Sequence, residues 1–156
     1  MPKARVKLET TLEQAQKDLD KFNKRMGKQP HVVVGVPADA SAYPDGTSVL
    51  LVALVHEFGS QVRNIPERSF LRAGVRKKRK EYAKFLSKIA QQGLAGKDLL
   101  RQLNRLGLVA QRDVRQELTD LKTPALTSRV GNPLVDTGHL RSSIQYEVRQ
   151  GADQRR

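Results

Sequence analysis

The longest amphipathic stretch of the chain covers residues 97–122 and predicts one helix, with Pro124 just beyond its end. At 1.5 Å per residue, such a helix would span on the order of 39 Å. One broad sector of its surface is apolar, and a sector of this kind faces a protein core. The residues of this apolar sector are Leu99, Leu103, Leu106, Ala110, Val114, Leu118 and Leu121.

The opposite sector of the same stretch is basic, with Leu108 as its only large apolar residue. One interpretation is an ordinary helix face turned to water. The alternative is a contact surface for DNA phosphates or for an acidic neighbour, because arginine pairs bidentately with phosphate and carboxylate. No aromatic residue that could stack on single-stranded bases lies in this sector, which argues against an RNA reader. The sector consists of Lys97, Arg101, Arg105, Arg112, Arg115 and Lys122, and its four arginines are the candidate residues that face a partner or DNA.

A second constraint is the unbroken apolar run V-L-L-V-A-L-V over residues 49–55. By itself this run fits a buried strand or a buried helix. Gly59 follows it and indicates a helix end, because glycine enters the left-handed conformation without a Cβ clash. Thr47 or Ser48 can cap the other end by accepting a backbone N–H. We therefore expect a short, mostly buried helix over about 48–58.

The segment after this helix is typical of a corner between two elements. Ile65 precedes a proline and is pushed out of the α region, so residues 61–65 are expected to be extended. Pro66 lacks an N–H and suits a helix entry. A long helix over about 67–92 is expected to follow. Lys78 falls on its apolar stripe, so the helix has to leave the core there or let the lysine snorkel.

Glu57, at the end of the apolar helix, has two interpretations. It is either a surface carboxylate or a buried carboxylate paired with Arg68 or Arg72. A lone buried charge costs several kcal/mol, so a buried Glu57 requires such a partner. The second interpretation predicts that Glu57→Ala lowers stability or assembly more than Glu117→Ala does.

The remaining patterns predict an α+β fold, with a small mixed or antiparallel sheet packed against two long helices and shorter helices. Strands are expected over about 3–9, 31–36 and 143–149, with 61–65 as a further candidate. A capping box formed by Thr10 and Glu13 opens another helix. The apolar stripe of that helix is Leu12, Ala15, Leu19, Phe22 and Met26.

Composition limits the class of protein. The length fits one domain over residues 1–150, with 151–156 as a mobile tail. The chain has no Cys, which excludes disulfides and thiolate metal sites. No apolar run is long enough to span a membrane, and the N-terminus lacks the apolar segment of a signal peptide. The formal net charge of +13 favours acidic partners.

Two short motifs are typical of enzymes, but both lack the context that catalysis needs. Asp136-Thr137-Gly138 matches the aspartic-protease triplet, yet the flanking strand and second glycine-bearing loop are missing. We interpret Asp136 as the cap of a short helical turn. His56-Glu57 begins like a zinc-protease helix, but Ser60 stands where the second His is needed. We expect no catalytic residue, no metal and no cofactor.

Two separated pieces of the sequence resemble one known family. They are A-L-V-H-E-F-G-S…I-P-E-R-S-F-L-R over 53–72 and P-L-V-D-T-G-H-L-R-S-S-I over 133–144. Together they resemble the neck and tail-completion proteins of tailed bacteriophages, a group labelled minor tail protein Z-like, virion morphogenesis or tail-component proteins. Ser69 departs from the second proline that is common in the family. The matching residues are Glu57, Phe58, Gly59, Ile65, Pro66, Arg68, Phe70, Leu71 and Arg72, then Asp136, Thr137, Gly138, Leu140, Arg141, Ser143 and Ile144.

The resemblance implies a non-enzymatic virion protein of the head–tail junction, made in the host cytoplasm, that completes or joins the tail as part of a multi-copy ring. Six copies are the first expectation and twelve the second, because tails in the family's setting have sixfold symmetry. The implied partners are other copies of the chain, neighbouring connector and tail proteins, and packaged DNA, with no membrane. The alternative is a basic nucleic-acid-binding or regulatory module, which would bind free DNA instead of having a multi-copy place in the virion.

Overall fold

The computed structural model describes residues 13–21, 23, 24, 27, 30–95, 98–121 and 138–150. Outside the described residues lie the predicted strand over 3–9, Lys97, Lys122, Asp136, Thr137 and the tail 151–156. The elements in chain order are β1 (His31–Gly35), α2 (Val49–Phe58), α3 (Phe70–Lys77), α4 (Arg79–Leu94), α5 (Leu99–Asp120), α6 (His139–Ser142) and β2 (Gln145–Arg149).

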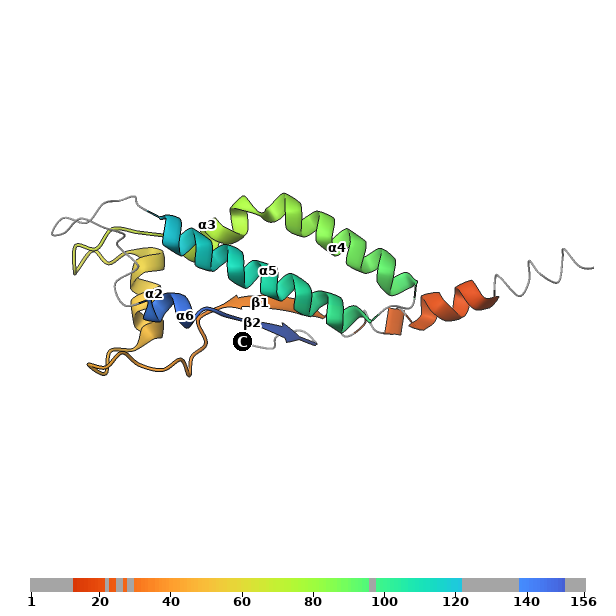
Figure 1. The fold of residues 1–156 in the computed structure, drawn as a ribbon, viewed down its shortest axis with the longest axis horizontal. Helices are drawn as coiled ribbons and strands as arrows, with labels where there is room; N and C mark the ends of the chain where they lie inside the picture. The colour runs from red at the N-terminus through yellow and green to blue at the C-terminus, as the bar shows by residue number, and fades with distance from the viewer. Residues whose placement is uncertain are drawn as a thin grey trace, which may run out of the picture.

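The fold is α+β, as predicted, and its described part contains a two-stranded antiparallel sheet. The pairing of β1 with β2 runs from His31 opposite Arg149 to Gly35 opposite Gln145. Figure 1 shows α5 between this sheet and the pair α3 and α4, and α5 contacts all four of these elements. The long amphipathic helix that the sequence predicts over 97–122 is therefore the central element of the described fold.

The apolar sector predicted on α5 is buried, and five of its residues belong to two core clusters. Ala110 is buried outside both clusters, and Leu121, which follows the last residue of α5, is partly buried and packs against the first cluster. The first cluster joins α5 to α2, α3 and α6, and the second joins it to α4 and the sheet. Their members are Val49, Ala53, Phe70, Val114, Leu118, Leu140 and Ile144 in the first, and Ile89, Leu99, Leu103 and Leu106 in the second.

Two glycines let the neighbouring elements approach α5 closely. A Cβ atom at Gly107 would lie within the ring of Tyr146 on β2. A Cβ atom at Gly74 on α3 would lie 3.2 Å from the Cα atom of Val114. Gly107 therefore lets the sheet lie against the central helix, because the Tyr146 ring leaves no room for a methyl group there. At Gly74 a methyl group would require Val114 to shift by a few tenths of an ångström.

The predicted ends of α2 are confirmed. The Ser48 hydroxyl accepts a hydrogen bond from the Leu51 N–H at 3.4 Å, and Gly59 ends the helix with a φ of 75°. The cap of α5 comes from Asp98, which accepts from the Leu100 N–H at 3.0 Å. Its place directly before the first buried leucine is the signal by which the sequence could have shown this cap.

The prediction of one helix over 67–92 is wrong. Two helices replace it, and the break lies at Lys78, whose φ of −98° and ψ of 5° interrupt the α conformation. Because Lys78 falls on the apolar stripe, a straight helix would carry its ammonium group toward the core. At the break this group instead pairs with Glu81 at 3.0 Å. The first helix also begins only at Phe70, so Pro66 does not form a helix entry.

The prediction that 61–65 is extended is also wrong. Residues 61–64 form a turn, and Ser60 and Ile65 pair across it through two backbone hydrogen bonds of 2.8 and 2.9 Å. Asn64 has a φ of 50°, a conformation that asparagine adopts more readily than most residues. The proline restricts only Ile65, so the local hydrogen bonds decide the conformation of the preceding residues.

Residues 13–21, 23 and 24 are helical, as predicted, and this helix projects past the ends of α4 and α5 (Figure 1). Its described side chains are exposed, apart from the half-buried Asp18. Leu19 is 49% exposed. The described members of the predicted apolar stripe, Ala15 and Leu19, therefore lie outside the core clusters.

Candidate functional site

Glu57 joins the end of α2 to the start of α3. It is 4% exposed, and its carboxylate accepts hydrogen bonds from the N–H groups of Leu71 at 2.9 Å and Arg72 at 3.0 Å. These are among the N–H groups that the first turn of a helix leaves without an intrahelical partner. The Ser69 hydroxyl donates to the same carboxylate at 2.8 Å. Glu57 thus caps α3 from a different helix, while Ser69 makes no side-chain cap bond of its own.

The charge of Glu57 is paired with Arg72, one of the two partners that the sequence predicts. The Arg72 Nε atom lies 2.9 Å from the Glu57 carboxylate, and its Nη2 atom donates to the Glu57 backbone oxygen at 2.9 Å. Nη2 also donates to the Glu67 carboxylate at 2.8 Å. The guanidinium carbon lies 4.8 Å from the centre of the Phe58 ring, within cation–π range. Arg68, the other predicted partner, is buried as well.

These contacts keep Glu57 ionised. Burial by itself would raise the pKa of Glu57, but the hydrogen bonds from Leu71, Arg72 and Ser69 outweigh it and hold the pKa below its usual value. The hydrogen bond to Glu57 in turn raises the pKa of Arg72. The first motif piece therefore forms a charged and hydrogen-bonded corner that holds α2 and α3 together.

The described part of the second motif piece, residues 138–144, lies in the same core as the first. Leu140 and Ile144 are buried in one cluster with Phe70, although α4 and α5 separate the two pieces in the sequence. Gly138 precedes α6 with a φ of 70°, where a residue with a Cβ atom would be strained. The helical turn predicted after Gly138 is confirmed, whereas its expected cap Asp136 lies outside the described residues.

Three of the four candidate arginines lie on the exposed surface of α5. Arg101 and Arg105 are exposed, and the Arg112 side chain is 73% exposed while pairing with Asp113 at 2.8 Å. Leu108 lies among them and is 55% exposed. This face of α5 therefore presents both cationic and apolar side chains.

Arg115, the fourth candidate, has an intramolecular role instead. Its Nη2 atom donates to the backbone oxygens of Ser142 at 3.1 Å and Ile144 at 2.8 Å. The Gln111 amide donates to the same Ile144 oxygen at 2.7 Å. The prediction that Arg115 faces a partner is corrected on this ground: the chain returns from α6 to β2 across this part of α5 and uses the guanidinium to satisfy its carbonyl groups.

Sequence reasoning missed one buried acid on the central helix. Asp113 is buried and accepts hydrogen bonds from the Tyr82 hydroxyl at 3.0 Å and from Arg112. Burial, followed by the hydrogen bond to Asp113, raises the pKa of Tyr82. The signal was present, because Asp113 lies three residues after Ala110 and seven after Leu106, in the apolar sector.

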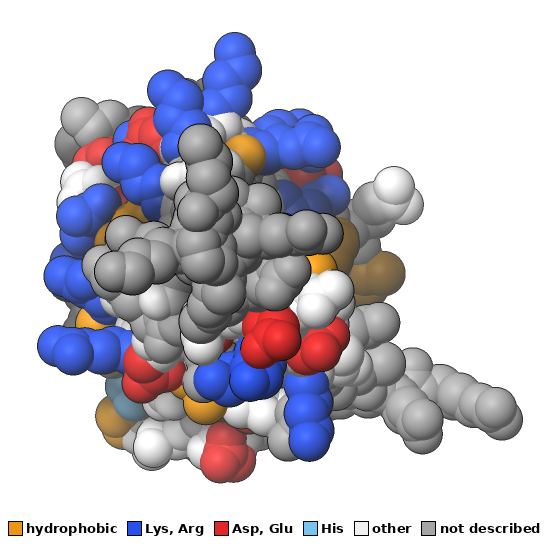
Figure 2. Space-filling view, turned by 90° about the vertical axis from the view of Figure 1, so that its right-hand side faces the viewer, with side chains coloured by type: hydrophobic (Ala, Val, Ile, Leu, Met, Phe, Trp, Pro, Cys, Tyr) orange, Lys and Arg blue, Asp and Glu red, His pale blue; other side chains and the backbone are white. Residues whose placement is uncertain are grey.

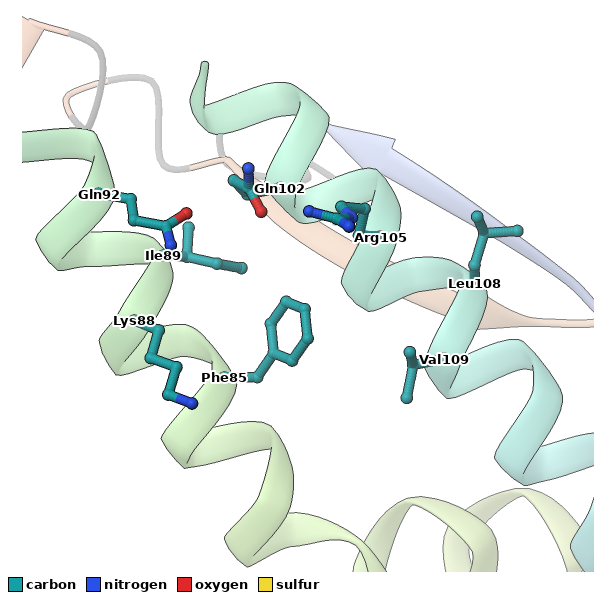
Figure 3. A pocket seen from close by; sticks show the side chains of 8 residues that line it. All are labelled: Phe85, Lys88, Ile89, Gln92, Gln102, Arg105, Leu108 and Val109. Carbon is teal, nitrogen blue, oxygen red and sulfur yellow. The ribbon is translucent and has the colours of Figure 1, made fainter. Parts of the chain in front are cut away.

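A groove of about 520 Å³ lies between α4 and α5, beside the exposed arginines. Figure 3 shows Phe85, Lys88 and Ile89 on α4, across the groove from side chains of α5. The lining combines apolar, cationic and amide side chains. It consists of Phe85, Ile89, Leu108 and Val109, of Lys88 and Arg105, and of Gln92 and Gln102.

The surrounding surface is rich in cations. Figure 2 views the molecule from the right-hand end of Figure 1 and shows Lys and Arg side chains along the upper and left-hand rim, with hydrophobic side chains between them. Within the described ranges, no group of three His, Cys, Asp or Glu side chains could hold a metal ion. In that same part of the chain, no helix has the length and apolar character needed to cross a membrane.

Comparison of the chain with protein-family models, with curated proteins and with solved structures finds no match. The features of the described chain that bear on function are therefore the corner around Glu57, the core shared by the two motif pieces, and the basic face of α5 with its groove.

Proposed function

We propose that this chain is a structural protein of a phage virion, located at the head–tail junction and acting as one copy of a ring that completes or joins the tail. The observation that carries the proposal is the meeting of the two motif pieces in one core, where Phe70, Leu140 and Ile144 pack together. A pattern whose distant parts form one structural unit is a stronger basis for the resemblance than two separate short matches.

The corner and the junction beyond α6 are suited to a load-bearing ring subunit. Glu57 fixes α2 to α3, and Arg115 fixes the α6–β2 junction to α5. Each contact joins segments that are distant in the sequence, so relative movement of these helices would break several hydrogen bonds at once. The second contact holds the α6–β2 junction against α5, so the exposed face of α5 keeps a defined position for neighbours.

The chemistry of the exposed face favours an acidic protein as its partner over DNA. Contacts to DNA phosphates come from cations and hydrogen-bond donors and do not need apolar side chains. The exposed Leu108 lies between Arg105 and Arg112, and the lining of the groove beside it includes the apolar residues Phe85, Ile89 and Val109. The proposed partners are therefore other copies of the chain and connector or tail proteins, and packaged DNA comes second.

The test uses a phage that encodes this chain and a derivative from which the gene has been deleted. Wild-type protein supplied from a plasmid should restore infectivity, and quantitative mass spectrometry of purified virions should find six or twelve copies per particle. Without the protein, electron microscopy should show heads and tails that fail to join. Virions that are infectious without the chain, or that contain none of it, would refute the proposal.

A surface variant tests whether the basic face acts in assembly. Arg101→Glu combined with Arg105→Glu should keep the circular-dichroism melt nearly unchanged, because exposed charges contribute little to stability. The same variant should fail to restore infectivity. The matched control is Lys24→Glu, which reverses the charge of an exposed lysine on another helix. Binding of the wild-type chain to duplex DNA at about 0.15 M salt, together with its absence from virions, would favour the nucleic-acid-binding alternative.

A further inference from the structure

The helix that contains residues 13–21, 23 and 24 exposes Ala15 and Leu19, the two described members of its predicted apolar stripe. It projects past the ends of α4 and α5 in Figure 1, and its described side chains are exposed apart from the half-buried Asp18. Leu19 is about half exposed although it occupies the middle of the stripe that the sequence predicts. An apolar stripe in this position is suited to contact with another surface.

The charges on this helix are sorted around the stripe. With 3.6 residues per turn, Asp18 and Asp20 lie roughly 100° to either side of Leu19, and Glu13 lies on the same side as Asp20. The three lysines of the helix lie on the opposite side of the cylinder. They are Lys17, Lys21 and Lys24. Asp20 and Glu13 therefore border one side of the stripe, whereas Asp18 on the other side pairs with Lys21 at 3.8 Å. A surface that matches the stripe is apolar along its centre and cationic at the edge that meets Asp20.

The groove between α4 and α5 has this combination of side chains. Phe85, Leu108 and Val109 supply apolar lining, and Lys88 and Arg105 are exposed cations on its two helices (Figure 3). The groove lining extends over residues 85–92 of α4 and 102–109 of α5, which is about 12 Å of each helix. The groove thus offers the chemistry that the projecting helix requires over about two helical turns.

We propose that the helix at residues 13–24 of one copy docks into the α4–α5 groove of the next copy. The contact is a helix in a groove, with apolar side chains at its centre and charge pairs beside them. Each chain carries both halves of the contact on different surfaces, so the contact is heterologous and a series of copies closes into a ring when its rotation permits. The inference deepens the proposed function and rests on its premise that copies of the chain associate.

Two variants, each altering one half of the contact, test this arrangement by sedimentation velocity of the full chain. The helix variant is Leu19→Lys with Asp20→Lys, and the groove variant is Arg105→Glu with Leu108→Glu. Wild-type protein should associate, and each variant alone should lose at least tenfold in association constant. The helix variant retains an intact groove and the groove variant an intact helix, so a mixture should form a 1:1 pair that grows no further.

Matched controls separate this contact from unfolding and from general charge effects. Lys24→Glu lies on the far side of the same helix, and Lys80→Glu lies on α4 but does not line the groove. Both should associate like the wild type, and circular dichroism should show all variants folded. As a further control, Asp20→Lys combined with Arg105→Glu should recover part of the association that each single change loses, because the charge pair is restored in reverse.

Several outcomes would overturn the inference. One is wild-type protein that remains monomeric at high concentration, which includes the case of a helix folded back on its own groove. Another is association that survives both variants, which would place the interface elsewhere while leaving the ring proposal intact. A mixture of the two variants that forms no pair would also refute the arrangement. Absence of the chain from virions, by contrast, refutes the phage role and does not bear on these solution measurements.

Discussion

Removal of the Glu57 carboxylate should be the most costly change to a charged side chain in the corner. Glu57→Ala leaves the Leu71 and Arg72 N–H groups without their acceptor, and a lost helix cap costs about 1 kcal/mol. The lost bond from the Ser69 hydroxyl adds about 1 kcal/mol. The Arg72 side chain is 46% exposed, so solvent screening limits the loss of its ion pair to about 1 kcal/mol.

These contributions sum to a loss of about 3 kcal/mol in the free energy of unfolding, which for a chain of this size corresponds to a fall in Tm of roughly 6–12 °C. Urea unfolding followed by circular dichroism measures the first quantity, and a thermal melt measures the second. Glu57→Gln should lose less than Glu57→Ala, because an amide oxygen can still accept one of the backbone hydrogen bonds.

The loss should also depend on pH. The pKa of Glu57 is lowered in the folded state, so the unfolded chain binds the proton more readily than the folded chain does. The stabilisation is therefore fully present above the ordinary carboxyl pKa of about 4.3 and is lost as the pH falls through the folded-state pKa. The difference between wild type and Glu57→Ala should be largest near neutral pH and should shrink as the pH falls below the ordinary carboxyl pKa.

An exposed acid serves as the control for this prediction. Glu147 pairs with Arg149 on the surface of β2, and Glu147→Ala should cost less than about 1 kcal/mol. Glu117→Ala should also cost less than Glu57→Ala, although Glu117 pairs with Lys77 at 2.6 Å and is not a neutral position. Equal losses for Glu57→Ala and Glu147→Ala, or a difference that does not change with pH, would refute the reasoning about the corner.

Three further substitutions test the packing of the fold, each by its free energy of unfolding in urea. Gly107→Ala should cost about 1–3 kcal/mol, because the added methyl group overlaps the Tyr146 ring, and Tyr146→Ala in the same chain should recover part of the loss. Arg115→Gln should cost about 1–3 kcal/mol because its hydrogen bonds to the two carbonyl groups are lost, whereas Arg101→Gln should cost almost nothing. Equal costs for the two variants would show that Arg115 is an ordinary exposed residue. Gly59→Ala should cost about 1–3 kcal/mol, because its φ is 75° and its Cβ atom would lie 2.9 Å from the Glu67 nitrogen; an unchanged stability would show that the α2–α3 corner relaxes.

The features of the fold that depend on residues close together in the chain are predictable from the sequence alone. The apolar period of α5, the cap at Ser48 and the end of α2 at Gly59 were all predictable. Helix periodicity and capping involve residues only a few positions apart, so the local pattern of side chains predicts them. The need of a buried Glu57 for a cationic partner was also predictable, because an unpaired buried charge is costly in any protein.

Which groups meet across the fold follows from the tertiary packing. Arg72 pairs with Glu57, Arg115 donates to the carbonyl groups of the α6–β2 junction, and the expected long helix is interrupted at Lys78. In each case several residues satisfy the local chemistry equally well. The choice among them depends on distances between segments far apart in the sequence, and these distances are set when α5 packs between the sheet and its neighbouring helices.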